Sequence, residues 1–331
     1  MNYRRLGKTG FNISEISLGT WQVGGRWGDP FDNANAERII ETAVDAGVNF
    51  IDTADVYSDR MSEAAVGRVV KRYQSRSKRV YVATKCGRFI NPHIDANYTP
   101  AALRTYVETS LKNSGLETLD LIQLHCPPQA TYDRAEIFSL FDDLKKEGKI
   151  LNLGVSVETI DQALKAIQYS NVTTIQIIFN MFRIRPSEVF FGEAHKKDVG
   201  IIVRVPLASG LLSGKFSQTT QFGKDDHRTF NRSGAAFDKG ETFSGVDYDT
   251  GLKAVEELKA LFPAGSDLAA MALRWVLMFP EVSTVIPGAS RVEQVAPNLA
   301  AANVRPLSKA EMDGVKAVYD KYIKSLVHHQ W

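Results

Sequence analysis

The sequence predicts an α/β fold in which eight parallel strands close into a (β/α)8 TIM barrel. Short apolar runs alternate with amphipathic helical segments along most of the 331 residues, which is the pattern of repeated strand–helix units. A barrel of this kind takes about 250 residues, and insertions lengthen it. An open doubly wound sheet would carry a glycine fingerprint after its first strand, but Gly24, Gly25 and Gly28 lack that spacing. We therefore expect a single barrel domain over residues 1–331.

The first element that the sequence predicts is an N-terminal β-hairpin, in which residues 3–6 and 11–13 flank a turn at residues 7–10. Eight short runs rich in leucine or β-branched residues follow it. Each run fits a strand that is buried on both faces of a parallel sheet. The expected strands are residues 15–18, 49–52, 80–84, 119–124, 150–155, 174–178, 201–205 and 283–286.

Helical periodicity fills the intervals between these strands. Ser62 and Ser266 are expected to cap two of the helices, because a serine hydroxyl accepts a hydrogen bond from a free backbone N–H at a helix start. Thr99 precedes Pro100, which fits the first helical position of the third helix. The expected helices are residues 33–46, 63–73, 101–114, 133–147, 158–168, 187–197, 267–279, 291–302 and 308–325.

Residues 216–247 interrupt the alternation after the seventh expected strand. The segment is rich in Gly, Ser, Thr and Asp, yet it contains Phe222, Phe230, Phe237 and Phe243. Disordered segments are poor in aromatic residues, and a long loop in a compact domain is usually functional. A loop that follows a barrel strand leaves at the catalytic rim, so we interpret this segment as a lid over a ligand.

Composition excludes several classes of function. Lys and Arg number 40 against 38 for Asp and Glu, so there is no electrostatic case for a nucleic acid or membrane partner. No apolar stretch approaches about 18 residues, and no signal-peptide pattern is present. Cys86 and Cys126 are the two cysteines of the sequence, and so few cysteines suggest a reducing compartment.

We expect a cytoplasmic protein. We also expect a monomer, since no helix has an unusually apolar outer face. No metal site is expected either. His328 and His329 are adjacent histidines near the C-terminus, and such histidines are usually solvated.

Four ionisable side chains lie at or just after the carboxyl ends of neighbouring expected strands. Asp52 ends the second strand and Tyr57 follows it, while Lys85 and His125 end the third and fourth strands. Parallel barrel strands bring these ends to one rim, where barrel enzymes carry their chemistry. Each residue alone has a structural explanation, such as a rim aromatic or an ion pair. The coincidence of all four favours catalysis.

These residue types fit the reduction of a carbonyl group. A hydride reaches the carbonyl carbon, and the oxygen then needs a proton. The Tyr57 phenol can donate it if its pKa falls from about 10 toward the working pH, and the Lys85 ammonium is expected to lower that pKa. Asp52 is expected to hold Lys85, and His125 to orient and polarise the carbonyl oxygen.

Several longer motifs accompany the four residues. They are Arg4-Arg5-Leu6-Gly7, Ser17-Leu18-Gly19-Thr20-Trp21, Asn49-Phe50-Ile51-Asp52-Thr53-Ala54-Asp55-Val56-Tyr57-Ser58, Ala83-Thr84-Lys85, Leu119-Asp120-Leu121-Ile122-Gln123-Leu124-His125, Leu153-Gly154-Val155-Ser156, Pro206-Leu207-Ala208-Ser209-Gly210-Leu211-Leu212-Ser213-Gly214-Lys215 and Val285-Ile286-Pro287-Gly288-Ala289. In this order the chain resembles the aldo-keto reductase family over almost its whole length. The resemblance maps Asp52, Tyr57, Lys85 and His125 onto the catalytic tetrad of that family.

The resemblance also implies that NADP(H) lies extended across the rim without a Rossmann fold. Ser156 and Gln176 match partners of the nicotinamide carboxamide, whereas Val157 stands where the family usually has an asparagine, a loss for which Asn180 is a candidate replacement. An arginine at position 291 favours NADP over NAD. The remaining cofactor residues implied are Gly19, Thr20, Trp21, Asp52, Pro206, Leu207, Ser209, Gly210, Leu211, Ser213, Lys215, Gly288, Ser290, Gln294 and Asn298.

Arg204 is a second departure from the family, because many relatives carry an aromatic residue at this position. Its planar guanidinium is expected to stack under the nicotinamide or to meet the pyrophosphate. The other interpretation is that Arg204 pairs with a carboxylate near the strand end.

The substrate is expected to be a small, moderately apolar aldehyde or ketone, or the apolar face of a sugar. In the reverse direction the enzyme would oxidise the corresponding alcohol. Trp21, Trp27, Tyr57 and His125 are expected to line its pocket, together with Phe89 and residues 328–331. Two other functions stay open at this point. One is a slow-turnover module that binds NADP(H) and senses redox state, as the related potassium-channel β-subunits suggest. The other is a Schiff-base lyase with Lys85 as the nucleophile.

Overall fold

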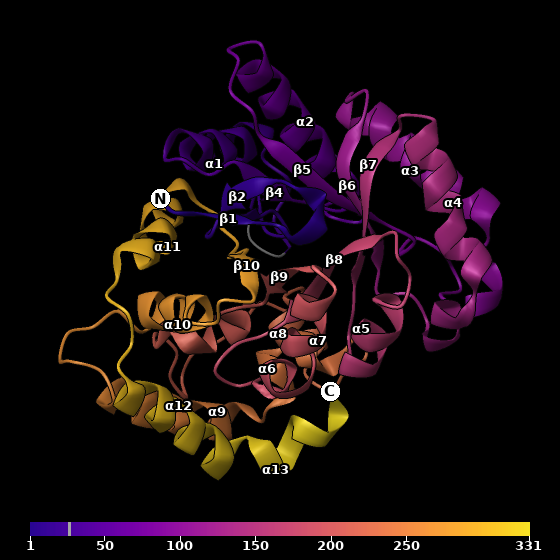
Figure 1. Cartoon of the computed structure of the whole chain (residues 1–331). Coiled ribbons are helices and arrows are strands. Elements are labelled where there is room, and N and C mark those ends of the chain that lie inside the picture. Colours follow the sequence, from indigo (N-terminus) through magenta and orange to yellow (C-terminus); the bar gives the residue numbers. More distant parts are fainter. Residues whose placement is uncertain (26–27) are drawn as a thin grey trace.

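Eight parallel strands form the centre of the computed structural model, which describes residues 1–25 and 28–331 (Figure 1). Each strand pairs in parallel with its neighbour in sequence. The sheet closes through bridges from Ile16 to Val285 and from Gly19 to Gly288, so the predicted barrel is confirmed. The strands are β3 (Leu18–Gly19), β4 (Phe50–Asp52), β5 (Tyr81–Cys86), β6 (Leu119–His125), β7 (Ile150–Ser156), β8 (Val172–Ile178), β9 (Gly200–Arg204) and β10 (Val282–Val285).

The predicted hairpin is present as β1 (Tyr3–Arg5) paired antiparallel with β2 (Asn12–Ser14). It lies at the amino-terminal end of the barrel, where the Arg4 guanidinium donates to the carbonyl of Val282, 2.9 Å away. Leu6 and Ile13 pack with strand residues such as Phe50, Leu121 and Ile202 in one buried cluster. The hairpin therefore closes the end of the barrel opposite to the carboxyl ends of the strands.

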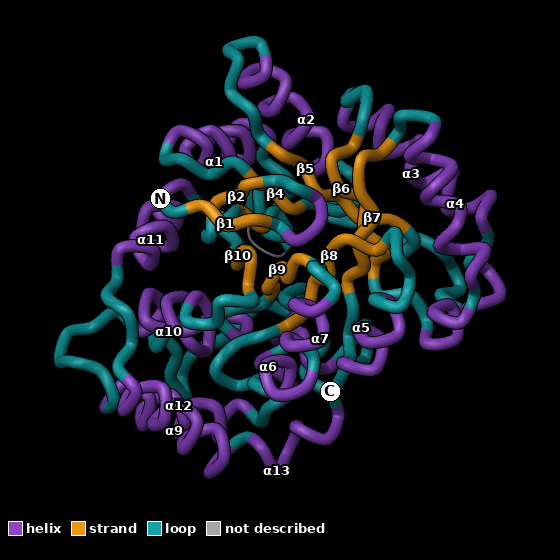
Figure 2. The backbone as a smooth tube through the Cα atoms, viewed as in Figure 1, coloured by secondary structure: helices purple, strands orange, loops and turns teal. Residues whose placement is uncertain are grey.

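Helices surround the strands on the outside of the barrel (Figure 2). Their apolar faces bury valine, isoleucine and leucine against the sheet, and this burial drives the packing. The helices are α1 (Asn33–Asp45), α2 (Met61–Gln74), α3 (Pro100–Ser114), α4 (Ala135–Lys146), α5 (Ile160–Ala166), α6 (Arg185–Val189), α7 (Phe191–Lys196), α8 (His227–Phe230), α9 (Tyr248–Ala260), α10 (Leu268–Leu277), α11 (Val295–Ala300), α12 (Lys309–Tyr322) and α13 (Lys324–Val327).

The predicted caps were right for α3 and wrong for two other helices. The Thr99 hydroxyl accepts a hydrogen bond from the N–H of Ala102, as expected. Ser62 lies inside α2, and its buried hydroxyl bonds Thr20 and contacts Thr53 instead. At α10 the cap is the carboxylate of Asp267, one residue after Ser266. Tertiary hydrogen bonds therefore engage Ser62 inside α2. At α10 the carboxylate of Asp267, which is a stronger acceptor than a hydroxyl, caps the helix in place of Ser266.

Four predicted helices differ in extent or are divided, including the one expected at residues 308–325, which forms α12 and α13, and two helices, α8 and α9, were not predicted. The segment expected at residues 187–197 is divided into α6 and α7, and the one expected at residues 291–302 contains only the six residues of α11 between short 3₁₀ turns. Residues 158–168 contribute only α5, which begins after its Thr159 cap. Of the two missed helices, α8 is a single short turn capped by Asp226, and α9 is capped by Asp247. The irregular composition before Asp247 hid this start signal.

The segment of residues 216–247 folds against the carboxyl end of the barrel. It contains α8 and two short 3₁₀ turns. Phe243 is almost fully buried, Phe222 packs between Phe216 and Tyr248, and Phe230 contacts Phe237. The aromatic side chains therefore hold the segment in place by packing, as their presence in the sequence predicted.

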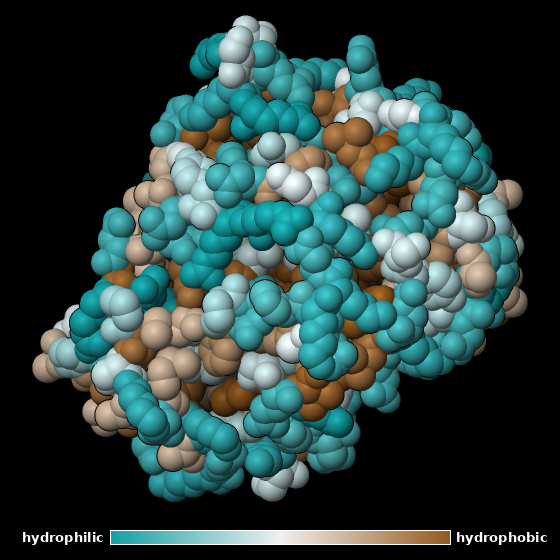
Figure 3. All heavy atoms as spheres, viewed as in Figure 1, coloured by the Kyte–Doolittle hydropathy of each residue, from teal (hydrophilic) through white to brown (hydrophobic). Residues whose placement is uncertain are grey.

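The surface shows hydrophilic side chains interspersed with small groups of hydrophobic ones on the face in Figure 3. Large apolar side chains that are exposed lie far apart in the sequence, for example Tyr3, Leu151 and Leu326. Within the described ranges, every helix is too short or too polar to cross a lipid bilayer.

Candidate active site

The carboxyl rim of the barrel brings together the four side chains that the sequence singled out. Asp52 ends β4, Lys85 lies near the end of β5, and His125 ends β6. Tyr57 lies in the turn between β4 and α2. The register pairs Asp52 with Ala83 and Lys85 with Gln123. Adjacent strands therefore deliver these groups to one place.

The Lys85 ammonium is the centre of this cluster. Its Nζ donates to Asp52 Oδ2 at 2.6 Å, to the carbonyl of Thr53 at 2.8 Å and to Tyr57 Oη at 3.2 Å. Lys85 is fully buried, and Asp52 is nearly so. Burial alone would lower the pKa of Lys85, but Asp52 and Tyr57 together raise it above its ordinary value. The ammonium is therefore charged, with all three N–H donors used.

The second carboxylate oxygen of Asp52 accepts hydrogen bonds from two glutamines. Asp52 Oδ1 accepts from Gln123 Nε2 at 3.0 Å and from Gln176 Nε2 at 2.7 Å, and the two amides lie 3.1 Å apart. Sequence reasoning missed Gln123, although a polar residue within the apolar run of β6 was a usable signal. Gln176 was expected to bind a carboxamide, but its Nε2 is committed to Asp52, so only its Oε1 is left to accept from a ligand.

The phenol of Tyr57 holds its proton firmly. Burial raises the pKa of Tyr57 to about 12, and the Lys85 ammonium offsets only part of that rise. Lys85 thus lowers the pKa of Tyr57 as expected, but the expectation that it brings this pKa toward neutrality is wrong. The desolvation of a buried phenolate and the nearby carboxylates of Asp52 and Glu241 outweigh one ammonium. At neutral pH the phenol is therefore protonated.

His125 is neutral in this environment. Burial lowers its pKa well below its ordinary value, and the cations Lys85, Arg88 and Arg204 add to the effect. Its ring meets the Tyr57 ring edge-on, with centroids 6.1 Å apart. Its Nδ1 is buried without a hydrogen-bond partner among the described residues. A neutral imidazole beside a phenol suits an uncharged polar group of a ligand, such as a carbonyl oxygen.

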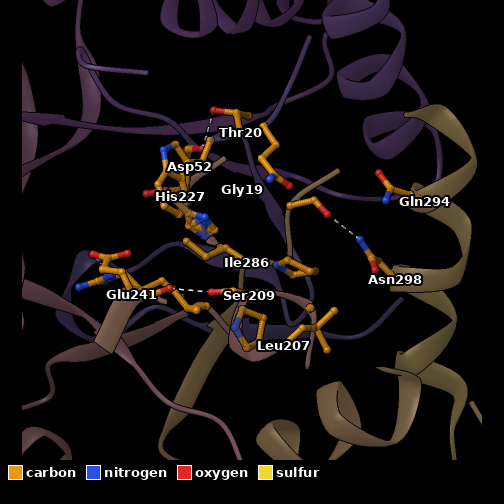
Figure 4. Close-up of a pocket in the computed structure, with 18 of the residues that line it drawn as sticks. Gly19, Thr20, Asp52, Leu207, Ser209, His227, Glu241, Ile286, Gln294 and Asn298 are labelled. Carbon is orange, nitrogen blue, oxygen red and sulfur yellow. Dashed lines mark hydrogen bonds and ion pairs between the residues drawn. The ribbon is translucent and has the colours of Figure 1, made fainter. Parts of the chain in front are cut away.

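A cavity of about 730 Å³ extends from this cluster across the rim. Figure 4 shows Asp52 and His227 on one side of it, Gln294 and Asn298 on the other, and Ser209 and Leu207 between them. Most of the residues implied for cofactor binding line it, namely Gly19, Thr20, Trp21, Asp52, Gln176, Arg204, Pro206, Leu207, Ser209, Gly210, Ser213, Lys215, Gly288, Arg291, Gln294 and Asn298.

Three of the implied cofactor residues do not line the cavity. Ser156 is buried, and its Oγ lies 3.7 Å from Cys126 Sγ. Leu211 points into the hydrophobic core. Ser290 instead orients Gln294, because its N–H donates to Gln294 Oε1 at 2.8 Å. Among the expected substrate residues, Trp27 lies outside the described part of the chain.

The predicted replacement for the missing asparagine is also absent from the cavity. Asn180 is fully buried, and its Nδ2 donates to the carbonyl of Val205 at 2.9 Å and to Ser244 at 3.0 Å. These bonds join the end of β9 to the 216–247 segment, so Asn180 contributes to packing at that junction.

Arg204 pairs with a carboxylate of the 216–247 segment. Its guanidinium bonds Glu241 and donates to the carbonyl of Val157 at 3.1 Å. Burial would lower the pKa of Arg204, but Glu241 raises it above its ordinary value. The Glu241 carbonyl in turn accepts from Ser209 Oγ at 2.7 Å. Of the two interpretations, the carboxylate pair is the one present, and it fastens the segment over the rim.

Replacing Glu241 with glutamine is therefore expected to loosen residues 216–247. The change removes the negative charge of a largely buried pair, while the glutamine oxygen can still accept a hydrogen bond from Arg204. Such a change typically costs about 1–3 kcal/mol, so backbone amides of this segment should exchange with solvent faster. Hydrogen exchange of the purified protein measures this directly. Glu256→Gln serves as the control, since Glu256 is exposed and its ion pair with Lys259 lies within α9. Equal exchange in both variants would show that the pair does not restrain the segment.

Five residues of the 216–247 segment line the cavity without having been predicted to do so, namely Phe216, His227, Arg228, Phe237 and Glu241. Two of them contact the ring of Trp21. His227 meets Trp21 edge-on at 5.1 Å between centroids, and Phe237 lies 6.0 Å from the same ring. Burial lowers the pKa of His227 to about 4, so it is neutral. The aromatic content of the segment pointed to Phe237, whereas nothing local to the sequence singled out His227.

The C-terminal residues lie away from the cavity, contrary to the expectation. Trp331 stacks on the guanidinium of Arg183 at 3.8 Å and packs against Gly240 and Gly245 of the 216–247 segment. Phe89 lies under the guanidinium of Arg60 at 4.5 Å. No group of three or more potential metal ligands is found in residues 1–25 and 28–331.

This chain is similar to known proteins in both sequence and fold. The sequence model of the Aldo/keto reductase family matches residues 15–320. The Bacillus subtilis aldo-keto reductase YhdN is 30% identical over 89% of this chain and 87% of its own, and the Escherichia coli NADH-specific methylglyoxal reductase is 29% identical over 92% and 94%. The solved structure of a Gluconobacter oxydans glycerol dehydrogenase aligns with a TM-score of 0.78 at 30% identity, covering 97% of this chain and 96% of that one.

Proposed function

The chain belongs to the aldo/keto reductase family, and we propose that it reduces aldehydes or ketones with NADPH and uses Tyr57 as the proton donor. One observation carries this proposal. The buried Lys85 ammonium bonds both Asp52 and the Tyr57 hydroxyl at one end of a long cavity. An acid held by a charged lysine next to a ligand cavity fits a reaction in which a ligand oxygen gains a proton.

The cavity also fits an extended dinucleotide. Lys215 and Arg291 line it, and neither forms an ion pair within the described ranges, so both are available to phosphate. The turn after β9 lines it too, and there Val205, Ala208 and Ser209 hold left-handed backbone conformations. Such strain clusters at ligand sites. When bound, a nicotinamide dinucleotide supplies the hydride.

The residues of this chain would carry the proton chemistry as follows. His125, being neutral, would donate a hydrogen bond to the carbonyl oxygen and orient it. As that oxygen becomes an alkoxide it is a stronger base than a phenolate, so the Tyr57 proton moves to it. The Lys85 ammonium would stabilise the phenolate that is left, and Asp52 keeps Lys85 charged and in position. Trp21, His227 and Phe237 would exclude water from this end of the cavity.

The preference for NADPH rests on Arg291 and Gln294. One relative is NADH-specific by its name, so family membership alone does not decide the cofactor. Arg291 is exposed at the far end of the cavity, and Gln294 is oriented there by Ser290. A guanidinium pairs well with the 2′-phosphate of NADPH. Glu293 lines the same end and opposes that phosphate, so we expect a moderate preference.

Arg291→Met is expected to weaken NADPH binding about 10-fold, because a charge-assisted hydrogen bond contributes about 1.5–3 kcal/mol and Glu293 offsets part of it. NADH binding should change less than about twofold, since NADH lacks the phosphate. Fluorescence titration of the purified protein with each nucleotide measures both constants. Arg76→Met, at an exposed position on the outside of the barrel, is the control for loss of a positive charge. An equal loss of affinity for both nucleotides would contradict the assignment.

A panel of aldehydes and ketones with NADPH tests the reaction itself. Steady oxidation of NADPH that depends on the carbonyl compound supports a reductase, whereas tight NADPH binding without turnover supports a redox-sensing module.

The charge and burial of Lys85 argue against the alternative of a Schiff-base lyase. A Schiff-base nucleophile must be neutral and accessible, but Lys85 is fully buried and its ammonium bonds three acceptors.

A further inference from the structure

Arg88 is a cation in the cavity that the proposed chemistry does not use. It follows β5 and lines the cavity together with His125 and Cys126. Its guanidinium Nη1 lies 3.4 Å from His93 Nε2 and 3.7 Å from Glu158 Oε1. The side chain is about one quarter exposed, so it can meet a ligand that enters from solvent.

Glu158 forms a long ion pair with this guanidinium, but neither neighbour accepts a hydrogen bond from it. His93 Nε2 lies 3.1 Å from the carbonyl of Cys126, and a carbonyl only accepts, so this nitrogen carries the proton and cannot accept from Arg88. The Glu158 carboxylate lies at 3.7 Å, beyond hydrogen-bond distance. Arg88 therefore keeps five N–H donors with no well-placed acceptor among the described residues.

The other cations around the reacting end of the cavity have close carboxylate partners. Lys85 bonds Asp52, Arg204 bonds Glu241, and Arg228 bonds Asp226 at 2.6 Å. Among the described residues, Arg88 is therefore the cation near His125 that lacks a carboxylate within hydrogen-bond distance. A ligand whose carbonyl oxygen reaches Tyr57 and His125 would present the rest of its structure to this region.

We propose that Arg88 binds a carboxylate of the substrate, so that the enzyme acts on aldehydes or ketones that carry a carboxylate, such as semialdehydes and oxo acids. This inference rests on the proposed function, because it assigns the substrate class of the same site. A planar guanidinium offers two parallel N–H groups that match the two oxygens of a carboxylate. His125 and Arg88 then hold the two ends of the substrate, which sets its orientation toward the Tyr57 hydroxyl.

The test compares 2-, 3- and 4-carboxybenzaldehyde with their methyl esters, with NADPH as the reductant. The three ring positions sample different separations between the aldehyde and the acid. The parent enzyme is expected to prefer at least one acid over its ester in kcat/KM, mainly through a lower KM. Arg88→Met should reduce that acid-to-ester ratio by about 10- to 100-fold, and Arg88→Lys should retain part of it. Arg76→Met should keep the parent ratio.

Glu158→Gln separates direct binding from a structural role. If Arg88 binds the substrate, removing the competing carboxylate keeps or raises the acid-to-ester ratio. Equal losses in Glu158→Gln and Arg88→Met would mean that Arg88 acts through its ion pair, and would overturn the inference. An unchanged ratio in Arg88→Met, or a parent enzyme that prefers no acid, would also overturn it.

The inference can fail independently of the proposed function. If the parent reduces neither acids nor esters, the reductase proposal fails, and calorimetric titration of the NADPH complex with the carboxybenzaldehydes then tests Arg88 alone. Weaker binding of the acids to Arg88→Met than to the parent supports the anion site. Equal binding to both overturns it.

Discussion

Replacing Tyr57 with phenylalanine is expected to lower kcat for carbonyl reduction by about 10²- to 10⁴-fold, which is the usual contribution of a general acid. The hydroxyl is the only polar atom removed, and its partner in the structure is the Lys85 ammonium. Binding of NADPH should stay within about twofold, since the ring remains. Single-turnover rates and a fluorescence titration measure the two effects separately.

The pH dependence gives a second readout for Tyr57. Because burial raises the pKa of Tyr57 to about 12, the phenol keeps its proton throughout the neutral range, and His125 stays neutral there. The reduction step should therefore be nearly independent of pH from about 7 to about 10 and should fall only at higher pH as the phenol ionises. Tyr106→Phe on α3, away from the rim, is the control. A Tyr57→Phe enzyme that turns over at the parent rate would refute the acid assignment.

Replacing Lys85 with methionine is expected to abolish most activity and to lower the free energy of unfolding by about 3–5 kcal/mol. Methionine fills a similar volume, so the loss comes from the charge. Asp52 would remain buried as a carboxylate next to Gln123 and Gln176 without its cation. Urea unfolding at neutral pH, with the linear extrapolation to water, measures the change.

The double variant Asp52→Asn with Lys85→Met is the matched control for this prediction. It removes both charges and should recover much of the lost stability, since a neutral amide does not need the ammonium. If the single and double variants unfold at the same urea concentration, the buried pair does not contribute as proposed.

Local sequence patterns were sufficient to predict the barrel and the position of its reactive rim. Each of the eight strands is a short apolar run that must be buried on both faces, and this requirement is visible without tertiary information. The polar residues Asp52, Lys85 and His125 end such runs, so parallel closure of the sheet necessarily gathers them. The cap at Thr99 followed by Pro100 is likewise a local signal, because the hydroxyl bonds an N–H three residues away.

Contacts between distant segments were decided only by the tertiary structure. The pairing of Arg204 with Glu241 and of Gln176 with Asp52 joins residues 37 and 124 positions apart, and the sequence contains many other possible partners for each group. The upward shift in the pKa of Tyr57 also depends on burial in the folded protein. Local pattern thus determined which residues reach the rim, whereas packing determined which partner each one meets there, since charge and hydrogen-bond energies depend on distance and solvent exposure.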